Sequence, residues 1–351
     1  MGAPTWPPTH MGAPTWPPNP QRSGRPGVAG AALDDPQTPN ARTAAATPSR
    51  SSMSGLAFVG LGAMGSRLAR RLLEAKHPVT GYNRTAAKAR ALEAAGLKLA
   101  PSPRAAVEGA VAVFSMVTDD AALRAVALGE NGIVAGLGRG AVWVEMSTVS
   151  PAVTRELGAV VAARGAAMLD APVSGSTITV EQGAASIAVG GERDALERVR
   201  PYLAAMAPGG ITHVGPLGLA KTMKIATNLG LAVQMLAFAE AVLLAEKAGI
   251  ARETAVEALL KSVIASPMVK YRGPYVVGTM AREAWFNVGM MQKDLQLALD
   301  QGHATGVTLP TTALAQQWLT MARGLGLGER DFGALFDVLA GLSGLPPSPN
   351  T

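Results

Sequence analysis

The chain has 351 residues, of which 48% are hydrophobic and 16% charged, a composition typical of a soluble globular protein with two domains and not of a disordered chain. Its net charge of +6 is not concentrated in any cluster of Lys and Arg, which argues against nucleic-acid binding. Cysteine is absent and the four histidines have no ligand spacing, so we expect neither disulfides nor a metal site.

The first 53 residues differ from the rest of the chain. The octapeptide MGAPTWPP occurs at 1–8 and again at 11–18, and a stretch rich in Pro, Ser, Ala and Thr follows. This segment has neither the periodicity of a helix or strand nor the apolar core of a signal peptide. We predict that residues 1–53 are a disordered leader or precede the true start, and that the protein is cytoplasmic. An organelle transit peptide is the alternative, although Asp34, Asp35 and the prolines argue against it.

From Leu56 onwards, short apolar runs alternate with amphipathic stretches. The runs predict strands, the stretches predict helices, and their alternation is typical of a mostly parallel α/β sheet. The predicted strands are 56–60, 79–82, 111–116, 142–146, 167–169 and 186–189, and the predicted helices are 63–75, 85–95, 120–128 and 151–164.

The first predicted strand runs into GLGAMG, from Gly60 to Gly65, which is a G-x-G-x-x-G motif. The motif alone is weak, but here it follows an apolar strand and opens an amphipathic helix, as in dinucleotide-binding proteins. Gly60 allows a tight turn, Gly62 lets the backbone approach a pyrophosphate, and Gly65 lets the helix pack on the strand. The helix N-terminus at Ala63 and Met64 would then bind the phosphates.

The end of the second predicted strand indicates which nicotinamide cofactor is bound. An NAD enzyme needs an Asp or Glu there to accept from the ribose hydroxyls, but Asn83, Arg84 and Thr85 occupy this place. Arg84 offers a guanidinium to a 2′-phosphate, and the alternative is an ordinary surface arginine. We therefore predict that residues 54–217 form a Rossmann-type domain that binds NADP(H).

Beyond about Pro216 the strand pattern stops. Gly218 to Ala248 contains no proline, and no charge lies between Lys224 and Glu240, which predicts one interdomain helix of roughly 45 Å. The uncharged interval is shorter than the ~18–20 residues of a membrane span, so we predict a helix buried on all sides and no membrane contact. Further helices are predicted at 252–264, 288–302, 310–324 and 331–339, so residues 218–345 form an all-helical domain for substrate binding and dimerisation.

Four segments together resemble the β-hydroxyacid dehydrogenase family over about 56–339. They are GLGAMG, DAPVSG at 170–175, KIATN at 224–228 and QKDL at 292–295. Ser176 stands where many members have glycine, and Thr227 where some have asparagine. The sequence looks most like the glyoxylate/succinic semialdehyde reductases. This resemblance implies an NADP-dependent oxidoreductase that interconverts a small semialdehyde, or a 2-oxo acid such as glyoxylate, with the hydroxy acid.

The resemblance also implies roles for individual residues. Lys224 is expected to be the general acid and base, and Asn228, one turn later on the same helix face, to contact the same ligand. By spacing alone Lys221 could compete with Lys224, but the asparagine four residues on selects Lys224. Ser174 and Gly175 are expected to bind the substrate carboxylate.

Two further residues are expected on the cofactor side. Thr148 follows the fourth predicted strand, near the nicotinamide ribose, and Lys293 reaches the cofactor from the helical domain. Asp294, as the neighbour of Lys293, is predicted to face elsewhere.

Alternative functions remain at this stage. The nearest is a 3-hydroxyisobutyrate dehydrogenase; an imine reductase and a non-catalytic NADP-binding module are more distant, because Lys224 is retained. The expected partners are a small carboxylate substrate and further copies of the chain, as a homodimer or homotetramer.

Overall fold

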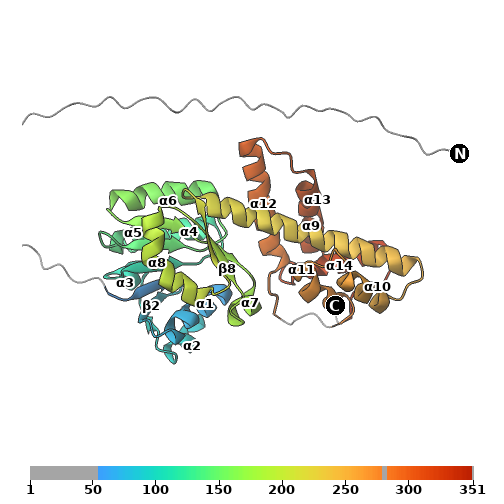
Figure 1. The fold of residues 1–351 in the computed structure, drawn as a ribbon, viewed down its shortest axis with the longest axis horizontal. Coiled ribbons are helices and arrows are strands. Elements are labelled where there is room, and N and C mark those ends of the chain that lie inside the picture. Colours follow the sequence, from blue (N-terminus) through green and yellow to red (C-terminus); the bar gives the residue numbers. More distant parts are fainter. Residues whose placement is uncertain (1–53, 279–282, 350–351) are drawn as a thin grey trace, which may run out of the picture. The chain divides into compact units, whose positions relative to one another are not determined.

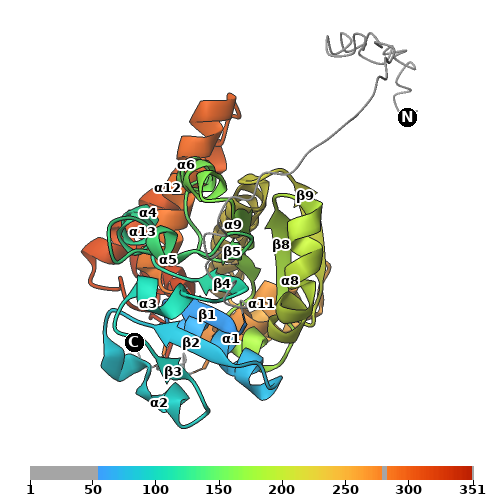
Figure 2. The same ribbon diagram turned by 90° about the vertical axis from the view of Figure 1, so that its left-hand side faces the viewer.

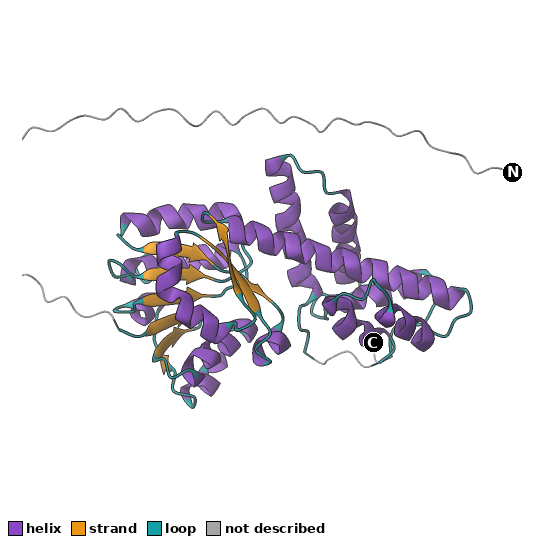
Figure 3. Cartoon of the chain, viewed as in Figure 1, coloured by secondary structure: helices purple, strands orange, loops and turns teal. Residues whose placement is uncertain are grey.

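The computed structural model describes residues 54–278 and 283–349. The predicted leader, 1–53, lies outside the described residues. A sheet flanked by helices extends to Gly215, and the named elements from Leu219 onwards are helical (Figures 1 and 3). An α/β domain followed by a helical domain, as the sequence predicts, is confirmed.

The sheet has nine strands in the order β3-β2-β1-β4-β5-β6-β8-β7, with β9 paired to β8. Its first six strands in this order pair in parallel, whereas β6 and β7 both pair antiparallel to β8. The sheet is therefore mostly parallel, as expected. The strands are β1 (Leu56–Val59), β2 (Val79–Tyr82), β3 (Lys98–Leu99), β4 (Ala112–Ser115), β5 (Val142–Glu145), β6 (Ala167–Asp170), β7 (Val173–Ser174), β8 (Ser186–Gly190) and β9 (Ile211–Gly215).

Helices cover both faces of this sheet (Figure 2). Along β1, Leu56 and Phe58 belong to the core under α1 and α8, while Ala57 and Val59 belong to the core under α3, α5 and α6. Because successive side chains of a strand point to opposite faces, a strand covered on both sides is apolar throughout. The helices of this part are α1 (Ala63–Glu74), α2 (Arg90–Glu93), α3 (Pro103–Val107), α4 (Asp120–Ala127), α5 (Ile133–Gly136), α6 (Pro151–Ala163), α7 (Thr177–Glu181) and α8 (Arg193–Met206).

Two details of the predicted elements are corrected. The single helix expected at 85–95 is wrong, since the segment forms a 3-10 turn at Ala86–Lys88 and the single turn α2. Only Ala89 and Leu92 are buried there, so packing supports no longer helix. Helix α8 was not predicted; its buried positions recur at helical spacing, but Pro201 and many charges interrupt the pattern.

The long helix is confirmed as α9, from Leu219 to Lys247. Within the single chain α9 buries one face and leaves Leu244 75% exposed, so the helical domain alone does not bury it on all sides. Helices α12, α13, α14, α10 and α11 pack against it and form a second core. Their bounds are α10 (Arg252–Lys261), α11 (Pro267–Arg272), α12 (Val288–Thr305), α13 (Pro310–Gly324) and α14 (Leu335–Leu342), with 3-10 turns at Gly273–Val276 and Phe332–Ala334.

Candidate active site

The glycine-rich turn lies at the carboxyl end of β1, where the strand order reverses between β1 and β4. Open α/β sheets bind ligands at such a switch point. Gly60 has a φ of +94°, and a Cβ there would lie 2.1 Å from the Met116 carbonyl oxygen. A Cβ on Gly65 would lie 2.0 Å from the Gly60 carbonyl oxygen, in the contact between α1 and β1. Both positions therefore need glycine for the fold itself.

Neither the backbone conformation nor any contact within the chain requires glycine at position 62. Its φ is −75°, and a Cβ would meet no described atom within 4 Å. It precedes Ala63, the exposed first residue of α1, while Met64 packs partly on the sheet core. The open space lies at a helix N-terminus, whose N–H groups attract anions. This cradle fits the pyrophosphate of a dinucleotide.

Asn83 shapes the loop beside this cradle. Its side-chain oxygen accepts from the Leu61 amide at 2.9 Å, and its nitrogen donates to the Thr85 carbonyl at 2.9 Å. The neighbouring Arg84 is exposed and has no ion-pair or hydrogen-bond partner among the residues that the structure describes. Its guanidinium is thus available to an anionic group of a ligand.

Lys224 lies in the second turn of α9 and is half-buried. Burial lowers its pKa from the ordinary lysine value, because an ammonium is poorly solvated there; the charge of Asp294 raises the pKa and that of Lys293 lowers it further. Two charged residues of α12 therefore act on the ammonium of α9. The net effect is a lowered pKa, so Lys224 loses its proton more readily than an ordinary lysine.

Asn228, Asp294, Lys293 and Thr148 form a chain of contacts next to Lys224. The buried Asn228 amide donates to Asp294 Oδ2 at 2.5 Å, and Lys293 Nζ lies 2.8 Å from Asp294 Oδ1. Lys293 also donates to the carbonyl oxygen of Thr148, which follows β5. The structure thus brings together Thr148 of the sheet domain and three polar residues of the helical domain.

The prediction that Asp294 faces elsewhere is wrong. Successive helix residues do point in different directions, but the four-carbon lysine stem is long enough to bring Nζ of Lys293 back to Asp294. Asp294 itself points to Asn228 on another helix. Only the packing of α12 on α9 could reveal this contact, because the two residues are far apart in sequence.

The structure separates the two candidate lysines. Lys221 is fully buried, and its Nζ donates to the carbonyl oxygens of Glu145 and Ser147 at 2.9 and 2.7 Å and lies 2.5 Å from Glu145 Oε2. Two hydrogen bonds to carbonyl oxygens and one ion pair with a buried carboxylate thus engage the Lys221 ammonium inside the protein. Lys224 is the lysine of this pair that remains free for a ligand.

Ser174 and Gly175 lie at the end of β7, which pairs with β8. Gly175 is exposed with a φ of +146°, and a Cβ there would lie 2.3 Å from Thr179 Oγ1. That hydroxyl instead accepts from the Ser176 amide at 2.6 Å. Helix α9 packs against β8, but the structure shows no hydrogen bond from Ser174 to Lys224 or Asn228 among the described residues.

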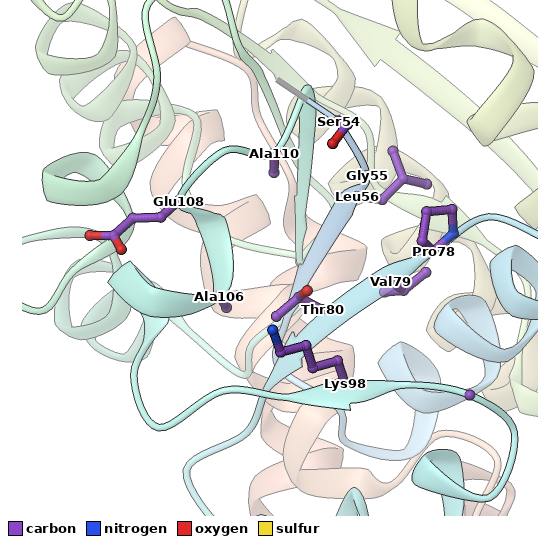
Figure 4. Close-up of a pocket in the computed structure, with 11 residues that line it drawn as sticks. Ser54, Gly55, Leu56, Pro78, Val79, Thr80, Lys98, Ala106, Glu108 and Ala110 are labelled. Atoms are coloured by element: carbon purple, nitrogen blue, oxygen red, sulfur yellow. The ribbon is translucent and has the colours of Figure 1, made fainter. Parts of the chain in front are cut away.

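A pocket lies at the other end of the strands from these residues and has no contact with them (Figure 4). It is lined by residues at the amino ends of β1 and β2, including Leu56, Pro78 and Val79. Each strand rises about 3.3 Å per residue, so the four residues of β1 separate this pocket from the glycine-rich turn. We assign no chemistry to it.

Within 54–278 and 283–349, no group of His, Asp and Glu could hold a metal ion. Helix α9 is long and apolar enough to cross a membrane. A core helix has the same composition, and the buried face of α9 packs against α12 and α14.

Comparison with known families places two domain models on the chain. Residues 55–215 match the NAD binding domain of 6-phosphogluconate dehydrogenase. Residues 218–339 match the NAD-binding domain of NADP-dependent 3-hydroxyisobutyrate dehydrogenase. The two matches meet between β9 and α9.

Individual relatives cover nearly the same region. The chain is 31% identical to glyoxylate/succinic semialdehyde reductase 2 of Arabidopsis thaliana, over 81% of this chain and 79% of the relative. It is 33% identical to an NAD-dependent L-serine dehydrogenase of Pseudomonas aeruginosa, over 82% of this chain and all of the relative. The solved structure of Mycobacterium tuberculosis 3-hydroxyisobutyrate dehydrogenase with L-serine is 31% identical, with a TM-score of 0.73, over 82% of this chain and 99% of that one.

Proposed function

The chain belongs to the β-hydroxyacid dehydrogenase family, and from this premise we propose that it is an NADP(H)-dependent reductase of a small semialdehyde, or of a 2-oxo acid such as glyoxylate. Its relatives are NAD(P)-dependent enzymes of hydroxy acids. The observation that carries the proposal is Lys224, whose pKa burial lowers and which stands beside Asn228, Asp294 and Lys293.

The proposed chemistry assigns proton transfer to Lys224. When bound, the nicotinamide supplies the hydride that forms the new C–H bond. As the carbonyl π bond breaks, the Lys224 ammonium donates a proton to the carbonyl oxygen, and in the reverse direction the neutral amine takes it back. A lowered pKa suits both directions, because a general acid or base works best when its pKa lies near the working pH.

Asn228 would hold the reacting group in place. Its side-chain oxygen is buried and has no hydrogen-bond partner among the described residues. Because residues i and i+4 share a helix face, this oxygen can accept from the Lys224 ammonium or from a substrate hydroxyl. Ser174 and the exposed backbone at Gly175 would bind the substrate carboxylate. We therefore propose a small carboxylate as the partner.

NADP(H) is favoured over NAD(H) by Arg84. The guanidinium is exposed and unpaired among the described residues, next to the loop that Asn83 shapes, and no carboxylate stands between Tyr82 and Thr85 to accept from a ribose hydroxyl. A 2′-phosphate would therefore meet a cation and no opposing charge. Lys293 and Thr148 would lie on the nicotinamide side of the cofactor.

A 3-hydroxyisobutyrate dehydrogenase is the second candidate. The similarity to the Mycobacterium tuberculosis enzyme favours it, and it would use the same lysine in the direction of oxidation. We also propose that the protein acts in the cytoplasm as a homodimer or homotetramer, without binding nucleic acid or membranes.

The test is turnover by the purified protein. Consumption of NADPH or NADH would be followed with glyoxylate, succinic semialdehyde, methylmalonate semialdehyde and tartronate semialdehyde. We expect NADPH to be preferred and one aldehyde to be reduced clearly fastest. Preference for methylmalonate semialdehyde would support the second candidate instead, and turnover of an imine but no aldehyde would refute both.

The Lys224→Ala variant tests the assigned chemistry. It should fold and bind NADPH but lose about 10²–10⁴-fold in kcat, the usual contribution of general acid–base catalysis. Lys247→Ala, at the exposed other end of α9, is the matched control and should keep wild-type turnover. Near-normal turnover by Lys224→Ala would refute the role of this lysine.

A further inference from the structure

A buried ion pair joins the sheet to the start of α9, outside the proposed chemistry. Glu145 is the last residue of β5 and Lys221 the third residue of α9, and both side chains are 0% exposed. Lys221 Nζ lies 2.5 Å from Glu145 Oε2 and donates to the carbonyl oxygens of Glu145 itself and of Ser147, in the loop that follows β5. Burying two charges costs solvation free energy that their attraction only partly offsets, so stability alone explains the pair poorly.

A second carboxylate holds the same helix end. Asp170, the last residue of β6, accepts from the Gly218 amide through Oδ1 and from the Lys221 amide through Oδ2, both at 2.8 Å. Both amides lie at the start of α9, where the backbone N–H groups have no carbonyl acceptor within the helix. The start of α9 is thus fixed to the carboxyl ends of two adjacent strands.

The same contacts also hold the loop after β5. Glu145 Oε1 accepts from the Ser147 amide at 2.9 Å, and the Ser147 carbonyl accepts from Lys221. Thr148, the partner of Lys293, is the next residue. On α9, Lys224 follows Lys221 by one turn and therefore lies on nearly the same side of the helix.

We infer that Glu145 and Lys221 are positioning residues for the reaction: their ion pair sets the rotation of α9 and the place of the loop after β5 together, so that Lys224 lies beside Lys293, the partner of Thr148. This inference rests on the proposed function. Neither member of the pair is among the groups that shift the pKa of Lys224, which are Asp294 and Lys293. The pair acts on where Lys224 lies and not on its charge.

The test replaces both members by neutral residues of similar size. Glu145→Gln/Lys221→Met removes both charges, avoids leaving one of them buried alone, and keeps an oxygen for the Ser147 amide. We expect a folded protein with near-normal NADPH affinity and a kcat lower by about 10- to 100-fold, because the reacting groups are misplaced. The control is Glu257→Gln/Lys261→Met, an exposed pair at 2.5 Å on α10, which should change none of these.

A second readout does not depend on turnover. Acetic anhydride acetylates lysines at a rate that depends on their accessibility and pKa, and mass spectrometry reports each site. Relative to the exposed Lys98, Lys224 should react faster in the double variant than in the wild type. If the wild type reduces no substrate, the proposed function fails, while this labelling still decides whether the pair positions Lys224.

Two results would overturn the inference: an unchanged kcat or an unchanged labelling rate of Lys224. If the double variant does not fold, Glu145→Asp serves instead. It keeps both charges but withdraws the carboxylate by one methylene, and it should lower kcat at near-normal NADPH affinity. Wild-type kcat in Glu145→Asp would equally overturn the inference.

Discussion

At the scale of single residues, the site depends on charges from α12 acting on one lysine of α9. Lys224 is close enough to Asp294 for the carboxylate to raise its pKa, against the effects of burial and of Lys293. Asp294 also accepts from Asn228. One buried carboxylate therefore orients the asparagine and stabilises the protonated lysine.

The variant Asp294→Asn tests this charge effect. It keeps an oxygen for Asn228 but removes the negative charge, so the pKa of Lys224 should fall further. Reduction needs protonated Lys224 and declines as pH rises through this pKa; oxidation needs the neutral amine and increases through it. Both limbs should therefore move to lower pH in profiles of kcat.

The matched control is Asp300→Asn, at an exposed position of the same helix, which should leave both limbs in place. A shift to higher pH in Asp294→Asn would contradict the assignment of Asp294.

The proposed preference for NADP(H) rests on Arg84. A hydrogen bond to a charged group contributes about 1.5–3 kcal/mol, so Arg84→Ala should weaken NADPH binding by about 10- to 100-fold and leave NADH binding nearly unchanged. Cofactor titration by fluorescence measures both affinities. Arg90→Ala, exposed on α2, is the control. Equal losses for the two cofactors would show that Arg84 does not contact the 2′-phosphate.

At the scale of elements, the glycines of the glycine-rich turn differ in what requires them. Gly60 and Gly65 are constrained by atoms of the chain itself, whereas the space beside Gly62 contains none of the described atoms within 4 Å of a Cβ. The same short motif therefore contains two glycines that the fold requires and one, Gly62, that we propose a ligand requires.

Two alanine variants distinguish these roles. Gly65→Ala forces a contact of 2.0 Å with the Gly60 carbonyl, and such overpacking typically costs about 1–3 kcal/mol; its Tm without cofactor should fall by several degrees. Gly62→Ala should keep the wild-type Tm but bind NADPH more weakly. Thermal unfolding with and without NADPH measures both effects, and a large loss of Tm in cofactor-free Gly62→Ala would contradict the assignment.

At the scale of the whole molecule, the helical domain leaves several large apolar side chains uncovered. Leu244 on α9 is 75% exposed, Leu342 at the end of α14 is 70% exposed, and Val263 after α10 is fully exposed. Both α10 and α14 pack against α9. Uncovered apolar side chains on packed helices are a common feature of subunit interfaces, which supports the proposed homo-oligomer.

Light scattering during size exclusion tests the oligomer. The wild type should have two or four times the chain mass of 35.8 kDa, and Leu244→Glu/Leu342→Glu should shift the protein towards the single-chain mass. Leu128→Glu, at an exposed position of the sheet domain, should leave the mass unchanged. A wild type with the mass of one chain would refute the proposal.

The sequence by itself determined the α/β sheet, the glycine-rich turn and the long helix, because these depend on local periodicity and on residues close together in the chain. It could not show how short α2 would be, because the length of a marginal helix depends on what packs against it. Nor could it show how much of α9 would be covered, since that depends on the number of helices around it.

The tertiary structure alone decided which polar residues meet. The asparagine four residues on already selects Lys224 over Lys221 in the sequence, and the fold shows what becomes of each: Lys221 is buried against Glu145 at 2.5 Å, and Lys224 lies beside Asp294. Asp294 and Asn228 are 66 residues apart. Contacts of this kind follow from the packing of α12 on α9 and of α9 on the sheet, which no local pattern in the chain specifies.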